Sequence, residues 1–60
     1  MKYFIITVHQ VRAIKPVSLL MKAPNFYQAW KEIYSANEDN ALIFYVEISK
    51  DQYEELVMVY

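Results

Sequence analysis

The segment that most constrains the fold is residues 25–36, in the middle of the chain. Its apolar side chains recur three and four residues apart, which is the spacing of one stripe along an α-helix. They are Phe26, Ala29, Trp30, Ile33 and Tyr34. Such a stripe needs another element to cover it, and the segments on either side have the composition of β-strands. The sequence therefore predicts a helix packed on one face of a sheet.

Two strands are predicted before this helix, over residues 3–12 and 17–22. The first is rich in β-branched and aromatic residues. Lys15-Pro16 interrupts the pattern, because proline fixes its own φ and biases the preceding residue towards extended geometry. Alternation of apolar and polar residues resumes at Val17. We therefore expect a β-hairpin, although it lacks an Asn-Gly or Asp-Gly turn.

A third strand is predicted after the helix, over residues 41–48. Because connections between parallel strands are right-handed, we expect it to lie parallel to the first strand and beside it. The helix itself should begin after Asn25, a favoured N-cap, with Gln28 three residues on as part of a capping box. The chain contains no glycine, so an asparagine of the 37–40 turn is expected to take the left-handed C-terminal cap.

The last segment is predicted to be a short helix over residues 50–58. Ser49 and Gln52 have the spacing of a capping box, and apolar residues follow at helical intervals: Tyr53, Leu56, Val57 and Tyr60. The alternative is a fourth strand over residues 55–60. The preferred fold class is a single α+β domain of residues 1–60 with the order β-β-α-β-α, in which the central helix packs on one face of a three-stranded sheet. This layout is common among very small bacterial and phage proteins, and it says little about function.

Composition favours self-association. The chain has 60 residues, 57% of them hydrophobic, and no cysteine. A domain of this size buries only about 60% of the surface of its unfolded chain, so some apolar side chains stay exposed in a monomer. Disulfides and cysteine metal clusters are excluded, which leaves oligomerisation as the usual support for so small a domain. We expect a homodimer.

Charge and hydropathy bear on location and partners. No apolar run approaches the length of a membrane span, so we expect a cytoplasmic protein without a membrane partner. Residues 1–31 contain five basic residues and no acid, whereas residues 32–60 contain seven acids and one lysine. This asymmetry fits either a basic face for a polyanion or complementary packing of two copies. The alternative is that folding interleaves the two halves and leaves no charged patch.

Catalytic signals are poor. Without glycine there is no phosphate-binding loop, dinucleotide fingerprint or nucleophile elbow. The acidic residues are predicted to lie on solvated helix faces or in loops. His9 is the one histidine, and its pairing with Glu47 across neighbouring strands would be the only route to a general base. We therefore expect no enzyme, no catalytic residue, no cofactor and no metal site, unless subunits pool residues around His9.

The second face of the sheet is the most informative feature. If Phe4, Ile6 and Val8 face the central helix, the residues of the other face are too apolar for open water. We predict that this face comprises Tyr3, Ile5, Thr7, His9, Val11, Leu20, Ile43, Tyr45 and Glu47. Its cover is the C-terminal helix, a second copy of the chain or a different partner.

Two functions follow from these expectations. The first is a non-enzymatic protein-interaction module, a homodimer that binds and modulates another protein through the open sheet face or the edge of the second strand. The expected contact residues are Tyr3, Ile5, His9, Tyr27, Tyr45, Tyr53 and Tyr60. The alternative is a nucleic-acid-binding protein that uses Arg12, Lys15 and Lys22, with bases stacked on Tyr3 or Tyr45.

Overall fold

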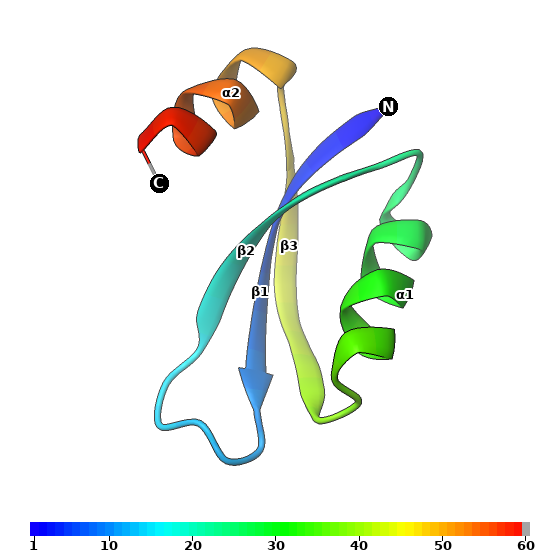
Figure 1. Cartoon of the computed structure of the whole chain (residues 1–60), viewed down its shortest axis with the longest axis vertical. Coiled ribbons are helices and arrows are strands. Elements are labelled where there is room, and N and C mark those ends of the chain that lie inside the picture. Colours follow the sequence, from blue (N-terminus) through cyan, green and yellow to red (C-terminus); the bar gives the residue numbers. More distant parts are fainter. Residues whose placement is uncertain (60) are drawn as a thin grey trace.

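The computed structural model describes residues 1–59 and has the order strand, strand, helix, strand, helix (Figure 1). The strands are β1 (Lys2–Gln10), β2 (Val17–Ala23) and β3 (Asn40–Ile48), and the helices are α1 (Phe26–Ala36) and α2 (Lys50–Val59). This is the predicted small α+β fold. The alternative of a fourth strand over residues 55–60 is wrong for its described part, because α2 continues through Val59.

β1 is the central strand, since the order across the sheet is β2-β1-β3. The hairpin of β1 and β2 is present as predicted. β3 does lie beside β1, but it runs antiparallel to it, so the prediction of a parallel pair is wrong. The helical connection joins β2 to β3, not β1 to β3. Because β2 is antiparallel to β1, this crossover makes β3 parallel to β2, with β1 between them.

The core lies between the sheet and α1. Phe4, Ile6 and Val8 alternate along β1 and are almost fully buried, and Ala29 and Ile33 of α1 are buried against them. Four further residues pack partly buried around this centre: Leu19, Met21, Phe26 and Trp30. The predicted stripe of α1 therefore faces the sheet, except that Tyr34 at its end is 46% exposed.

Side-chain caps fix where both helices begin. Asn25 Oδ1 accepts a hydrogen bond from the amide of Gln28 (2.9 Å) at the start of α1. At the start of α2 the capping box is complete, because Ser49 Oγ accepts from the amide of Gln52 and Gln52 Oε1 accepts from the amide of Ser49. These bonds satisfy amides that a helix leaves without partners in its first turn.

The end of α1 differs from the prediction. Asn37 is extended, with φ −156°, and no residue within 1–59 has a positive φ. The amide of Asn37 donates to the carbonyl of Ile33 (3.2 Å), and Nδ2 of the buried Asn40 donates to the same oxygen (3.3 Å). The predicted left-handed cap is therefore wrong. Two donors satisfy this carbonyl without the steric cost of a left-handed residue.

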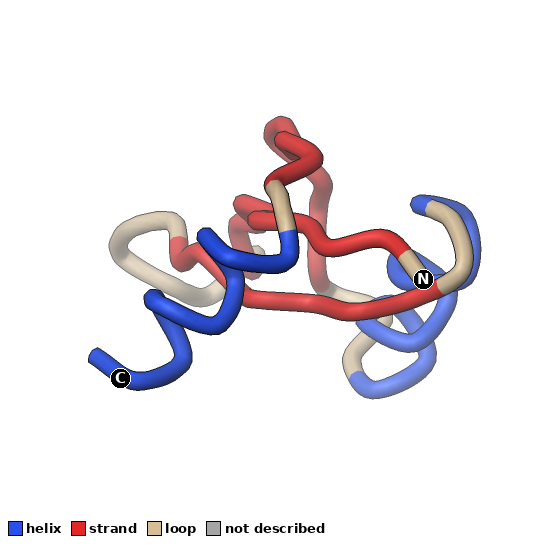
Figure 2. The backbone as a smooth tube through the Cα atoms, turned by 90° about the horizontal axis from the view of Figure 1, so that it is seen from above, coloured by secondary structure: helices blue, strands red, loops and turns tan. Residues whose placement is uncertain are grey.

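The two helices lie on opposite faces of the sheet. In Figure 1 the strands lie between α1 and α2, and Figure 2 shows the same separation from above. α2 crosses only the end of the sheet where β1 begins and β3 ends. No helix within residues 1–59 is long and apolar enough to cross a membrane.

Candidate functional site

The two faces of β3 are assigned by its pairing with β1. Residues opposite each other in an antiparallel pair carry their side chains on the same face. Tyr45 is opposite Ile6 and Glu47 is opposite Phe4, so both lie on the α1 face. The ring of Tyr45 also stacks on that of Phe26, with centroids 3.7 Å apart. The prediction that Tyr45 and Glu47 lie on the second face is therefore wrong.

The second face of β3 is instead formed by Phe44, Val46 and Ile48, which are opposite Thr7, Ile5 and Tyr3. The register shifts between Leu42 and Phe44, because Leu42 is opposite Val8, Phe44 is opposite Thr7 and Ile43 has no opposite residue. Ile43 is thus a bulge residue, which belongs to neither face in the simple alternation. Val11, also predicted on this face, lies in the turn after β1.

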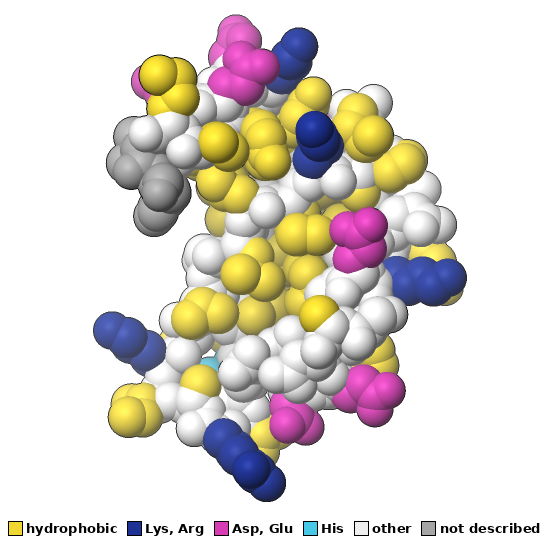
Figure 3. All heavy atoms as spheres, viewed as in Figure 1, with side chains coloured by type: hydrophobic (Ala, Val, Ile, Leu, Met, Phe, Trp, Pro, Cys, Tyr) yellow, Lys and Arg dark blue, Asp and Glu magenta, His cyan; other side chains and the backbone are white. Residues whose placement is uncertain are grey.

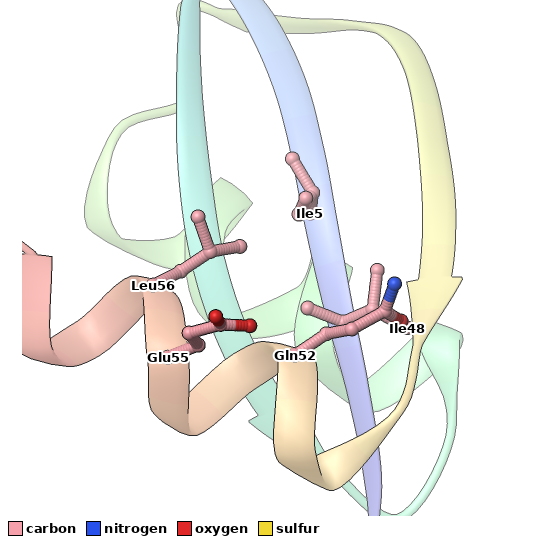
Figure 4. A pocket seen from close by; sticks show the side chains of 5 residues that line it. All are labelled: Ile5, Ile48, Gln52, Glu55 and Leu56. Carbon is pink, nitrogen blue, oxygen red and sulfur yellow. The ribbon is translucent and has the colours of Figure 1, made fainter.

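α2 covers one end of this second face. The rings of Tyr3 and Tyr53 pack with their centroids 4.9 Å apart, which holds the first turn of α2 on the start of β1. Below the helix lies an open pocket of about 390 Å³. Figure 4 shows that its side chains come from β1, the end of β3 and α2. They are Ile5, Ile48, Gln52, Glu55 and Leu56.

Beyond α2 no helix covers the sheet, although Thr7 at its centre is buried and Ile5 and Leu20 are half-buried. Two neighbouring cross-strand rows lie there, one of Leu20, Ile5 and Val46 and one of Ser18, Thr7 and Phe44. We call the side chains of these rows the open sheet face. Figure 3 shows the molecule hollowed between α2 and the β1–β2 hairpin, with hydrophobic side chains along the hollow and basic ones near the hairpin end. Phe44 is 54% exposed and Val46 47%.

Among the three strands, β3 is the most exposed. Every residue from Ala41 to Glu47 is exposed, on both faces of the sheet. In β1, by contrast, residues 4 and 6–8 are buried. Residues 40–46 carry no charge and include Leu42, Ile43 and Phe44. A strand with this composition is normally covered, so β3 is the apolar surface that most needs a partner.

The predicted contact residues are divided among three places. Tyr3, Ile5 and His9 lie on the second face with Tyr53, whereas Tyr45 lies under Phe26 on the other face. Tyr27 is 68% exposed on α1. Tyr60 lies outside the described residues. The structure therefore brings four of the seven predicted residues to one face, beside the pocket and the open sheet face.

The residues of the nucleic-acid hypothesis are not gathered into one platform. Arg12 and Lys15 are exposed in the hairpin turn, and Lys22 is exposed opposite Tyr3 at the other end of β2. The two rings proposed to stack bases lie on opposite faces, and each already contacts an aromatic ring of the chain.

His9 is not positioned beside an acid. Its Nε2 donates to the carbonyl oxygen of Ala13 (3.1 Å), and the residue opposite it on β3 is Ala41. Glu47 lies on the other face, 3.9 Å from Lys2 Nζ. The predicted His9–Glu47 pairing is therefore wrong. Within residues 1–59 no three His, Cys, Asp or Glu side chains group closely enough to hold a metal ion.

Phe44 and Val46 are the site residues that sequence analysis missed. Alternating residues of β3 form two sets, and sequence analysis assumed that the more apolar set faces α1. Phe44 and Val46 belong to that set. A signal for the correct orientation was present in the charges. Lys2 has the same strand parity as Phe4, so a Lys2–Glu47 pair requires Glu47 to share the face of Phe4.

The fold and the surface define a small α+β protein with a partly uncovered sheet face and an exposed apolar edge strand. Comparison of the chain with models of protein families, with curated proteins and with solved structures finds no significant match to any of them.

Proposed function

We propose that this chain is a non-enzymatic protein-interaction module that functions as a homodimer and binds and modulates another protein. The observation that carries the proposal is the exposure of apolar β3 next to the open sheet face. Phe44 and Val46 are about half exposed although both lie within β3 and are paired with β1. Apolar surface of this kind typically marks a protein–protein contact.

The neighbouring pocket supports a protein partner. Its walls are mostly aliphatic, with Ile5, Ile48 and Leu56 around the polar ends of Gln52 and Glu55. A partner's apolar side chain can enter this pocket while its backbone or neighbouring side chains cover Leu20 and Val46. Anchor residues seated in pockets supply most of the affinity in many protein interfaces.

Sedimentation equilibrium over a dilution series, at low and high salt, tests the homodimer. An apolar contact predicts a dimer that persists on dilution to micromolar concentrations and hardly responds to salt. Binding to phosphates weakens steeply with salt, so the same titration with single-stranded nucleic acid tests the alternative function. A monomer at every concentration would contradict the homodimer.

Affinity capture tests the second partner, with Leu20→Lys as the variant of the open sheet face. Leu20 lies on β2, away from β3, so this change leaves the β3 surface intact. Ile14→Lys is the matched control, because Ile14 is fully exposed in the hairpin turn. We expect the wild type and Ile14→Lys to capture the same protein after nuclease treatment. Leu20→Lys should not capture it. Equal retention by all three would place binding elsewhere.

A further inference from the structure

β3 forms one edge of the sheet. Its inner side pairs with β1, and within the described part of the chain no strand pairs with its outer side. Such an edge presents a row of backbone N–H and C=O groups that another strand can bond. The side chains beside this row are half exposed on both faces of the sheet, so both hydrogen-bonding and apolar contacts are available there.

We propose that the occupant of this edge is β3 of a second copy of the same chain, paired antiparallel about a two-fold axis normal to the sheet. This deepens the proposed function, since it rests on the homodimer and states how it forms. The pairing joins two three-stranded sheets into one continuous sheet. It places the two copies of α1 on one face and the two copies of α2 on the other.

The register follows from the side chains. In a two-fold antiparallel pair one residue lies opposite its own copy, and we infer that this residue is Tyr45. Phe44 then lies opposite Val46 of the partner copy, an aromatic and β-branched pair of the kind that stabilises sheets. Centring on Val46 would bring the two copies of Glu47 closer together. Centring on Phe44 would set the bulge residue Ile43 opposite Tyr45, next to the axis, whereas centring on Tyr45 moves Ile43 one residue further from the axis.

Charge does not oppose pairing of this edge with its own copy. Residues 40–46 are uncharged, and the carboxylate of Glu47 lies 3.9 Å from Lys2 Nζ of the same chain. With Tyr45 at the centre, Glu47 lies opposite the bulge residue Ile43 of the partner copy. Like charges directly opposite each other destabilise strand pairing, and this register opposes none.

The surface area of the chain is consistent with a missing neighbour. The accessible surface is 4637 Å². The scaling for folded monomers gives about 4,100 Å² for a chain of this mass, so roughly 500 Å² is in excess. Stable interfaces bury about 800 Å² on each partner, so this excess is more than half of what one partner of a stable dimer buries.

Hydrogen–deuterium exchange of the wild type tests the pairing directly. Amides of β3 alternate between those bonded to β1 and those directed outward. We expect the outward set to exchange rapidly in dilute protein and at least about 10-fold more slowly above the dimer dissociation constant, while the set bonded to β1 stays protected throughout. A dimer in which every second β3 amide stays unprotected would overturn the β3 pairing and leave the homodimer intact.

Single cysteines test the register, since the chain has none of its own. Under mild oxidation Tyr45→Cys is expected to form a disulfide dimer, because residues opposed across strands lie within disulfide distance. Lys22→Cys on the exposed edge of β2 is the matched control and should stay monomeric on non-reducing gels. Dimer formation by Lys22→Cys alone would overturn the proposal, whereas a monomeric wild type would overturn the homodimer as well.

Discussion

The two edge strands of this sheet differ in how well they are protected against pairing with another strand. β2 is seven residues long, follows Pro16 and carries Ser18 and Lys22. β3 is nine residues long and has no charge before Glu47. Proline, lysine and shortness are the devices by which proteins prevent edge strands from pairing. β2 carries a lysine, is preceded by a proline and is the shorter strand, whereas β3 has neither residue, so the molecule has one better-protected edge and one edge that can pair.

The position of α1 strengthens this difference. Leu19 and Met21 of β2 pack partly buried against the core beneath α1. On the other side of β1, Tyr45 is covered by Phe26 but stays 45% exposed. β3 is richer in large apolar residues than β2, yet it is the more exposed strand. Burial in this fold is therefore set by where α1 crosses the sheet, and it leaves the apolar side chains of β3 available for the proposed contact.

A single open edge would limit the proposed association to a dimer. Pairing of β3 with its own copy is a closed, two-fold contact that leaves only protected β2 edges outside. A chain with two open edges would add further copies and form fibres. In the proposed dimer, the contrast between β2 and β3 is thus the feature that prevents further growth, and it can be broken in several ways.

The largest effect is expected from the strand that both edges share. Ile6 of β1 is fully buried and lies opposite Leu19 on β2 and Tyr45 on β3. Ile6→Ala removes core contacts and leaves a cavity, so we expect a loss of about 2–5 kcal/mol in the free energy of unfolding. Urea denaturation followed by the fluorescence of Trp30 measures it, at a fixed protein concentration because dimerisation adds to apparent stability.

The fully exposed Ile14 supplies the control for this change. Ile14→Ala removes the same atoms without opening a cavity, so the free energy of unfolding should change by less than about 0.5 kcal/mol. Equal losses for the two variants would show that β1 is not the centre of the core.

A second way to break the contrast is to remove the protection of β2. Pro16→Ala with Lys22→Val gives the chain two open edges, and neither residue is buried. We expect assemblies that grow beyond the dimer as concentration rises, visible as a steady increase in mass by light scattering. The reason is that contacts through β2 then alternate with contacts through β3.

Closing the other edge is the control. Phe44→Lys with Val46→Lys places charges on both cross-strand rows of β3, and two such changes are expected to weaken the dimer by about 100-fold or more. Added to the unprotected β2 variant, they should limit assembly to pairs. Growth that continues regardless would mean that the assemblies form through another surface.

Most of the fold could be predicted because local signals agree with the tertiary structure. The α1 stripe, the Asn25 cap and the Ser49–Gln52 capping box each specify an element by itself, and the structure has all of them. The direction of β3 could not be obtained in this way. It depends on which strand the crossover starts from. The prediction applied the right-handed rule to β1 and β3, but α1 connects β2 to β3.

The candidate site was predicted in part. Tyr3, Ile5, Thr7, His9 and Leu20 do share the second face, because strict alternation holds along β1 and β2. On β3 both alternating sets are apolar, so alternation alone does not decide which set faces α1. The bulge at Ile43 then shifts the register within the strand. The exposure of Phe44 and Val46 follows from the limited reach of α1 and α2, which no local pattern records.

The smallest effect is expected from Glu47→Gln, which increases the difference between the β2 and β3 edges. Glu47 is the single charge on β3, and its contact with Lys2 is long, with both side chains 55% exposed. Exposed ion pairs contribute about 0–1 kcal/mol, so Glu47→Gln should change the free energy of unfolding by less than about 0.5 kcal/mol. Because the change removes the last charge from the pairing edge, the dimer should become up to a few-fold tighter and less dependent on salt.

Glu54→Gln is the matched control for this prediction. It makes the same charge change on α2, where Glu54 lies 4.0 Å from Lys50 and is similarly exposed. The dimer dissociation constant of this variant, measured by sedimentation, should equal that of the wild type because α2 lies away from the β3 edge. A dimer that weakened in Glu47→Gln alone would mean that the carboxylate attracts a basic group of the partner copy. The register centred on Tyr45 would then have to shift to bring such a group opposite residue 47.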